Sequence, residues 1–174
     1  MKEMIRYGIT LALICLAASA SLAIVNSFTK AKILAQGLSE EEASLKEVFP
    51  EAANFEAVKS GNEVVYYKAL DKDNKIIGAV FKASAKGYSS TIETMAGLTP
   101  DAQITAIKVV SQNETPGLGA QVAEADFSSR FCAKNAQNLN EVQAITGATI
   151  SSRAVIDSVQ RRAQDIRELM GYGR

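Results

Sequence analysis

The chain has 174 residues, of which 47% are apolar, enough for one domain of ordinary size and a small additional element. Lysine and arginine together number 19, as do aspartate and glutamate, so no basic excess favours nucleic acid as a partner. Histidine is absent, which excludes Ser-His-Asp and Cys-His catalytic sets, histidine-ligated zinc and histidine-ligated haem. The two cysteines form no Cys-x-x-Cys motif, so an iron–sulfur cluster held by this chain alone is also excluded. Any redox chemistry therefore needs an organic cofactor.

Residues 8–25 form an uncharged apolar run near the N-terminus. At about 1.5 Å per residue, such a helix spans most of a bilayer core of about 30 Å. A cleaved signal peptide would use the small-x-small site at residues 18–20, but the apolar residues continue beyond it. A lipid attached at Cys15 would want a small residue before it, and Ile14 stands there. We predict a retained transmembrane helix, with residues 1–28 forming the helix and its flanks.

The charges around this run give its orientation only weakly. Lys2, Arg6 and the free amino terminus precede it, with Glu3 against them, and Lys30 and Lys32 follow it. The positive-inside rule therefore only barely favours a cytoplasmic N-terminus. We expect a single-pass protein of the cell (inner) membrane whose soluble domain lies on the extracytoplasmic side.

Residues 29–60 are predicted to form a helical stalk. Ser39 with Glu42 three residues later has the pattern of a capping box, which begins a helix, and Pro50 would end it. The glutamates at residues 40–42 favour the first turn of a helix over a metal site.

Residues 61–174 indicate an α+β domain. Predicted strands at residues 63–70, 76–85, 91–98 and 103–111 are separated by polar turns, which gives an antiparallel meander of about four strands. Residues 121–134 are predicted to form a helix with Val122, Ala125, Phe131 and Cys132 towards the core. Cys132 is accordingly expected to be a small buried residue.

A glycine-containing loop at residues 113–119 precedes that helix, and its Pro-Gly pair is a strong turn signal. It is either an ordinary strand-to-helix connection or a loop that lifts Glu114, Thr115 and Leu118 out of the scaffold together. In the second case, an apolar Leu118 at the tip could cover a flat ring.

The segment at residues 145–152 lies between a strand-like stretch at 142–145 and an amphipathic helix predicted from Ser152 to Met170. Gly147 permits a turn that a residue with a Cβ would resist, and a helix start offers free N–H groups to an anion. Either Thr149 offers its hydroxyl to a phosphate held there, or Thr149, Ser151 or Ser152 merely caps the helix. These residues alone leave both alternatives open.

Three motifs occur in this order behind one membrane span: Lys-Gly-Tyr at residues 86–88, Glu-Thr-Pro-Gly-Leu-Gly at 114–119 and Thr-Gly-Ala-Thr at 146–149. Together they resemble the G subunit of the Rnf ion-translocating electron-transport complex. That subunit belongs to the FMN-binding domain family, which it shares with the C subunit of the sodium-pumping NADH:quinone oxidoreductase. The resemblance covers essentially the whole chain.

The resemblance implies an N-terminal transmembrane helix followed by an antiparallel-sheet FMN-binding domain, at residues 61–174, with a C-terminal helix. It implies one FMN bonded covalently to Thr149 through a phosphoester and attached by a separate flavin transferase that uses FAD. The implied cofactor-binding residues are Thr146, Gly147, Ala148, Thr149, Ser151 and Ser152 of the box, Glu114, Thr115, Gly117 and Leu118 of the loop, and Tyr88. No catalytic or metal-binding residue is implied.

The implied function is that of a covalent-flavin electron carrier in a membrane complex that couples ferredoxin:NAD electron transfer to Na⁺ or H⁺ translocation. Its partners would be the other subunits of that complex, and the carrier would have no substrate site of its own. The alternatives are a related FMN-domain subunit of a quinone reductase, a stand-alone membrane-anchored flavin reductase, and a membrane-anchored binding module in which Thr149 only caps a helix.

Overall fold

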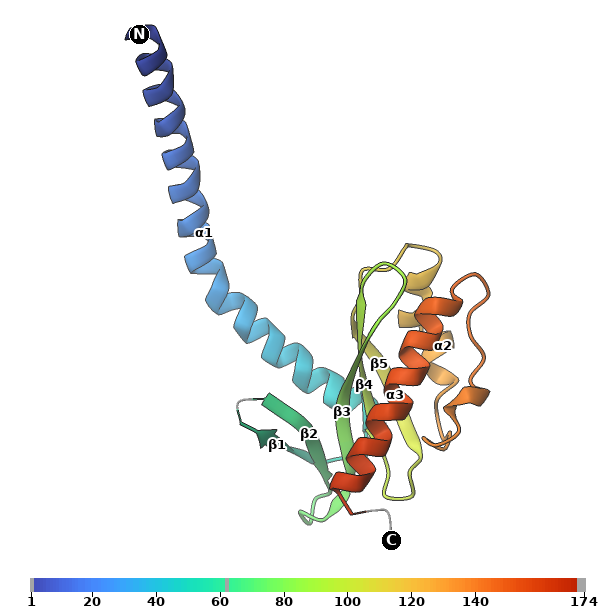
Figure 1. The fold of residues 1–174 in the computed structure, drawn as a ribbon. Coiled ribbons are helices and arrows are strands. Elements are labelled where there is room, and N and C mark those ends of the chain that lie inside the picture. The colour runs from blue at the N-terminus through green and yellow to red at the C-terminus, as the bar shows by residue number, and fades with distance from the viewer. Residues whose placement is uncertain (1, 62, 172–174) are drawn as a thin grey trace. The chain divides into compact units, whose positions relative to one another are not determined.

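The structure is a computed structural model that describes residues 2–61 and 63–171 (Figure 1). In chain order its elements are α1 (Lys2–Val48), β1 (Asn54–Ser60), β2 (Glu63–Leu70), β3 (Ile76–Lys86), β4 (Thr91–Leu98), β5 (Ile104–Ser111), η1 (Gly119–Ala123), α2 (Ala125–Ser129), η2 (Leu139–Glu141) and α3 (Thr149–Leu169). The chain divides into two compact units, residues 1–42 and residues 43–174. Helix α1 therefore begins in the first unit and ends in the second.

The first unit is the long apolar part of α1. Within it, Glu3–Lys30 is long and apolar enough to cross a membrane, as the sequence predicts. Four hydroxyls in this stretch each donate to the carbonyl oxygen four residues earlier, at 2.8 or 2.9 Å; they belong to Thr10, Ser19, Ser21 and Thr29. These hydroxyls are thus satisfied inside the helix itself, which is what a hydrocarbon environment requires.

The predicted stalk differs from the structure at both ends. No new helix begins at Ser39, because α1 is continuous from Lys2 to Val48 and residues 26–48 contain no proline that would interrupt it. The chain then forms strand β1 at Asn54–Ser60, where the sequence predicted stalk. Strand β1 is largely exposed and shows no clear alternation of buried residues, so it is defined by its pairing with β2.

The five strands form one antiparallel sheet in the order β1-β2-β3-β4-β5, one strand more than the predicted meander. Each strand pairs with its neighbours in the chain, and the β3–β4 pair continues without a bulge to Lys86 and Thr91. Strands β3 and β5 both flank β4, so the loop that follows β5 and the loop that joins β3 to β4 emerge at the same end of the sheet.

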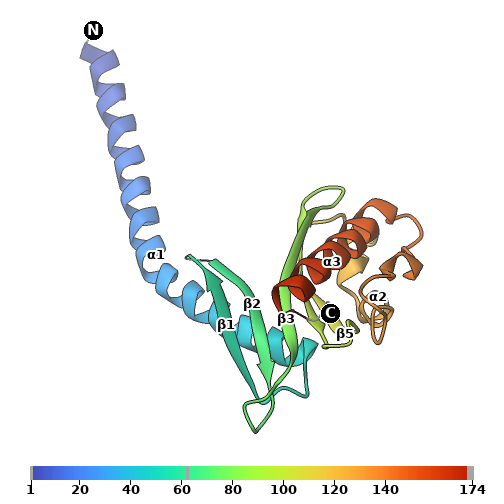
Figure 2. The same ribbon diagram turned by 60° about the horizontal axis from the view of Figure 1, so that its bottom comes forward.

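One face of the sheet is covered by α3, which packs against β3 and β4 (Figures 1 and 2). The core on this side contains alternate residues of the strands, such as Phe81 and Leu98, together with Val155, Val159 and other residues of α3. Ala163 and Ile166 continue the same buried stripe and Met170 packs against it, whereas Leu169 is exposed. Helix α3 is thereby fixed on the sheet along most of its length.

The opposite face of the sheet is covered by the end of α1, in the second unit. Leu45, Val48 and Phe49 pack there against inward residues of β2, β3 and β4, including Met95. A Cβ at Gly78 would lie 2.5 Å from the Phe49 ring, so glycine is needed for this close approach. The result is a three-layer domain in which the central strands β3 and β4 are buried on both faces.

The predicted helix at residues 121–134 is broken into the short elements η1 and α2. After α2 the chain continues in tight turns, in which the N–H of Phe131 and the N–H of Cys132 each bond to the carbonyl three residues earlier. Phe131 is fully buried in this arrangement. Cys132 points the other way and is exposed, so the prediction that it is buried was wrong.

Candidate functional site

Three separate segments surround a cavity of about 460 Å³ at the end of the sheet where β3 and β5 finish. They are the loop after β3, the loop after β5 and the start of α3. The lining residues are Tyr88, Glu114, Thr115, Leu118, Gly119, Gly147, Ala148, Thr149, Ile150 and Ser151. Eight of the eleven predicted cofactor-binding residues therefore line one cavity, although 61 residues separate the first segment from the last.

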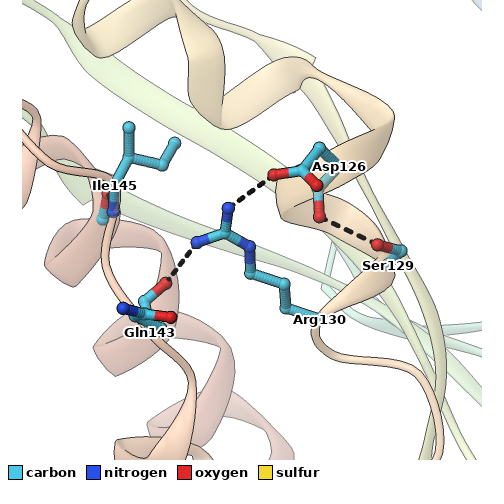
Figure 3. A network of polar contacts seen from close by, with 6 residues as sticks. Asp126, Ser129, Arg130, Gln143 and Ile145 are labelled. Atoms are coloured by element: carbon cyan, nitrogen blue, oxygen red, sulfur yellow. Dashed lines mark hydrogen bonds and ion pairs between the residues drawn. The ribbon is translucent and has the colours of Figure 1, made fainter.

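The linker that leads into α3 is held at two points. It is not the predicted strand at residues 142–145, since the Ile145 N–H bonds to the hydroxyl of Ser152 at 3.0 Å and pairs with no strand. Arg130 of the turn after α2 reaches across and donates to the Gln143 carbonyl at 2.9 Å, while it also pairs with Asp126 (Figure 3). The linker is thus tied both to the helix that follows it and to the neighbouring turn.

The turn before α3 brings Thr149 to the first position of the helix. Gly147 has a φ of +82°, a conformation that favours glycine, and Ala148 is the N-cap residue. No side chain caps α3, so the alternative in which Thr149, Ser151 or Ser152 serves as the cap was wrong. The helix also begins three residues earlier than the predicted start at Ser152.

The hydroxyls of this segment differ in what they can do. Ser152 is buried and donates to the Ala148 carbonyl at 2.9 Å, and Ser151 is buried and donates to Glu114 at 2.7 Å. Thr149 is exposed, lines the cavity and makes no hydrogen bond within the described residues. Thr146 is exposed as well, but it lies outside the cavity lining. Of the four hydroxyls, only that of Thr149 is both free and in the cavity.

Glu114 lines the cavity and is only 6% exposed. The prediction that the loop lifts Glu114 outward was therefore wrong, although Thr115 and Leu118 are exposed. Burial by itself raises the pKa of this carboxyl, but hydrogen bonds from Ser151, Ser90 and Ser89 outweigh it and lower the pKa from 4.5 to about 2. Glu114 is therefore an ionised group at every physiological pH.

Comparison with known proteins places the chain in a family. Residues 1–48 match the RnfG N-terminal region, and residues 87–164 match the FMN-binding domain. The G subunit of the ion-translocating oxidoreductase complex of Methanosarcina acetivorans is 34% identical over 172 residues, covering 91% of this chain and 92% of that one. The G subunit of the Na(+)-translocating ferredoxin:NAD(+) oxidoreductase complex of Acetobacterium woodii is 31% identical, covering 94% and 91%.

This chain belongs to the family of Rnf G subunits. Among solved structures, NqrC of Shewanella oneidensis shares its fold, with a TM-score of 0.51 and 19% identity over 70% of this chain and 74% of that one. The resemblance predicted from the three motifs is thereby confirmed. So is the predicted fold class, an N-terminal apolar helix followed by an antiparallel sheet and a C-terminal helix.

In this Rnf G-family chain, every residue that lines the cavity lies inside the segment that matches the FMN-binding domain. The cavity lining includes three large apolar or aromatic side chains, Leu118, Ile150 and Tyr88, which are 50%, 56% and 69% exposed. Exposed apolar groups gathered around one cavity mark a binding site.

Sequence reasoning missed two lining residues, Gly119 and Ile150. A Cβ at Gly119 would lie 2.7 Å from Glu114 Oε2 and 2.7 Å from Ser151 Oγ, so a glycine is needed to leave room for the Glu114 carboxylate. Gly119 was missed because Glu114 was expected to point outward. Ile150 could have been found as an exposed apolar residue beside Thr149. Gly117, Thr146 and Ser152, which were also predicted to bind the cofactor, lie outside the lining.

Proposed function

We propose that this protein is an electron carrier that holds one FMN covalently, through a phosphoester to Thr149. It would serve in a membrane complex that couples ferredoxin:NAD electron transfer to translocation of Na⁺ or H⁺. The observation that carries the attachment site is the free, exposed hydroxyl of Thr149 in the cavity, beside serines whose hydroxyls are already engaged. The relative from Acetobacterium woodii, named for ferredoxin:NAD(+) oxidation–reduction and Na⁺ translocation, supports the wider role.

The residues present fit an FMN. A volume of about 460 Å³ is within the roughly 300–1,000 Å³ of ordinary cofactor and ligand sites. The start of α3 supplies uncapped N–H groups and the positive end of a helix dipole, which suit a phosphate. Leu118, Ile150 and Tyr88 supply an apolar wall for a flat ring. When bound, the flavin would supply reversible electron transfer.

Each part of the cavity has a distinct task in this proposal. The first turn of α3 holds the phosphate end of the cofactor, with Thr149 as its covalent anchor. Leu118 and Ile150 exclude water from one part of the ring. Attachment consumes FAD: the Thr149 oxygen bonds to the phosphorus of the flavin half, the pyrophosphate bond breaks, AMP leaves and the hydroxyl proton is released. A separate flavin transferase is the expected catalyst, and an exposed Thr149 is accessible to such an enzyme.

The proposed topology has a cytoplasmic N-terminus, one membrane-spanning helix within Glu3–Lys30 and the flavin domain outside the cytoplasm. Its support is the length and composition of that helix and, for the orientation, the weak charge bias predicted from the sequence. A covalent bond would then prevent loss of the cofactor from the extracytoplasmic face.

Mass analysis of peptides from the full-length protein, produced together with a flavin transferase, tests the attachment. The peptide that contains Thr149 should carry the mass of FMN less water, and Thr149→Ala should abolish both this adduct and the flavin fluorescence of the denatured band. Ser158→Ala is the matched control, since it removes a buried hydroxyl of the same helix that bonds only to the Val155 carbonyl, and it should keep the adduct. An adduct found only on Thr146, Ser151 or Ser152 would contradict the assignment.

A further inference from the structure

Glu114 connects two parts of the cavity, the loop after β3 and the start of α3, which no strand pairing joins. Its Oε1 accepts from the Ser89 N–H at 3.0 Å and from the Ser90 N–H at 2.8 Å. Its Oε2 accepts from the Tyr88 N–H at 3.2 Å and from the Ser151 hydroxyl at 2.7 Å. One side chain thus joins the loop after β3 to the first turn of α3.

Every hydrogen-bond donor to this carboxylate in the described part of the chain is neutral. Three are successive backbone N–H groups, and the others are the hydroxyls of Ser90 and Ser151. Successive N–H groups that point at one anion form a nest, and hydrogen bonds to a charged acceptor are about twice as strong as neutral ones. The charge of Glu114 is therefore stabilised by the loop backbone and not by a counter-ion.

Two glycines make room for the carboxylate. A Cβ at Gly87 would lie 2.7 Å from Glu114 Oε1, and a Cβ at Gly119 would lie 2.7 Å from Glu114 Oε2. The loop after β3 and the loop after β5 can therefore close on Glu114 only because both positions lack a side chain. The loop is further fixed by the Asn113 N–H, which donates to the Ser90 hydroxyl at 2.8 Å.

We infer that Glu114 is a positioning residue for the cofactor: it locks the loop that carries Tyr88 onto the turn that carries Thr149. The inference rests on the proposed function, because the cavity between these two segments is the proposed flavin site. Glu114 acts through Ser151, two residues after the anchor, and through the loop backbone. Without this link, the aromatic wall and the covalent anchor would move independently of each other.

Amide hydrogen exchange of the full-length, flavin-free protein tests the link itself. In Glu114→Gln, the amide NH₂ replaces an acceptor with a donor that faces other donors, so at least one hydrogen bond to the loop is lost. We expect exchange of the Tyr88, Ser89 and Ser90 amides to accelerate about tenfold or more, which corresponds to about 1.4 kcal/mol. Ser158→Ala is the control, since Ser158 is a buried serine of α3 that bonds only to Val155 within the helix. Equal exchange in Glu114→Gln, Ser158→Ala and wild type would overturn the inference.

The flavin itself provides the second measurement, with Ser151→Ala as the milder variant. Ser151→Ala removes one hydrogen bond to Glu114 and leaves Thr149, the proposed attachment residue for FMN, in place. We expect the covalent adduct to persist, while the visible circular dichroism of the flavin falls at least twofold because the ring is held less rigidly. Ser158→Ala should match wild type. Wild-type dichroism in both Ser151→Ala and Glu114→Gln would overturn the positioning role. Absence of an adduct from the wild-type protein would instead contradict the proposed function.

Discussion

The Ser152 hydroxyl accepts the Ile145 N–H at 3.0 Å and so closes the turn from which α3 begins. The same oxygen donates to the Ala148 carbonyl, which places it between the two ends of the turn. Gly147, with its left-handed conformation, and Thr149 both lie inside this closed segment. The position of the proposed anchor is therefore set by a side chain three residues further along the helix.

Ser152→Ala should destabilise the protein by about 1–3 kcal/mol, because the Ile145 N–H loses its partner in a partly buried place. Denaturant unfolding followed by tyrosine fluorescence measures this, since the chain has no tryptophan. Ser158→Ala should cost less than about 1 kcal/mol, because its hydroxyl bonds only within its own helix. Equal costs would show that the turn is held by other contacts.

Leu118→Ala should keep the bond between FMN and Thr149 but alter the flavin absorbance and raise its reduction potential. Water in place of leucine better solvates the negative charge of a reduced ring, and about 1 kcal/mol of such stabilisation corresponds to roughly 20 mV for a two-electron couple. A redox titration of the purified protein gives the shift. Leu169→Ala, which truncates an exposed leucine at the far end of α3, is the control. An unchanged spectrum and potential in Leu118→Ala would place the loop away from the ring.

The protein should lose stability in acid because of Glu114. Its folded-state pKa of about 2 lies below the ordinary value of 4.5, so the stabilisation is complete above about pH 4.5 and is lost as the pH falls towards 2. The contribution of this carboxylate should be about 3 kcal/mol. Melting temperatures from pH 6 to pH 2.5 should fall less in Glu114→Gln than in wild type. The exposed Glu51 offers a control, and a parallel fall in Glu114→Gln and Glu51→Gln would refute the assignment.

Arg130→Ala should destabilise the linker before α3 through the bond to the Gln143 carbonyl, and not through the ion pair. Asp126 is largely exposed, and exposed ion pairs are worth about 0–1 kcal/mol. We expect a loss of about 1–2 kcal/mol in Arg130→Ala but under about 0.5 kcal/mol in Asp126→Asn. Unfolding free energies of both variants decide this, and a larger loss in Asp126→Asn would reverse the ranking.

The exposed Cys132 provides a native test of topology. With the flavin domain outside the cytoplasm, an impermeant thiol reagent should label Cys132 in intact cells that lack an outer-membrane barrier. Cys132→Ser should abolish the labelling, since Cys15 lies in the apolar helix. Labelling that requires lysis would reverse the orientation.

Much of the fold could be predicted because local pattern and tertiary structure agree. Strands β2 and β4 were predicted at their observed bounds, 63–70 and 91–98, because strand-forming residues are flanked there by polar turns. Strand β1 could not be found this way, because most of its residues are exposed on both faces. The short helices after residue 119 were predicted as one long helix, since periodicity does not reveal where a chain bends into turns.

The cavity was predicted from its motifs, but the direction of Glu114 was not. Its partners are backbone N–H groups 24 to 26 residues earlier and a serine 37 residues later, and neither carries a local sequence pattern. Gly119 was missed for the same reason, since a glycine that spaces a carboxylate looks like any loop glycine. Hydrogen bonds between a side chain and backbone groups far away in the sequence cannot be predicted from a single sequence.

The contacts that define the surroundings of Thr149 join residues from different parts of the chain. Ser152 lies seven residues after Ile145, and Glu114 lies 37 residues before Ser151. During synthesis, the sheet and Glu114 emerge before Thr149, whereas Ser152 and the rest of α3 emerge after it. The surroundings of the anchor are therefore complete only when α3 has packed on the sheet. An attachment enzyme that requires this geometry would modify mature domains and pass over nascent ones. The flavin content of a preparation would then serve as a count of correctly assembled molecules.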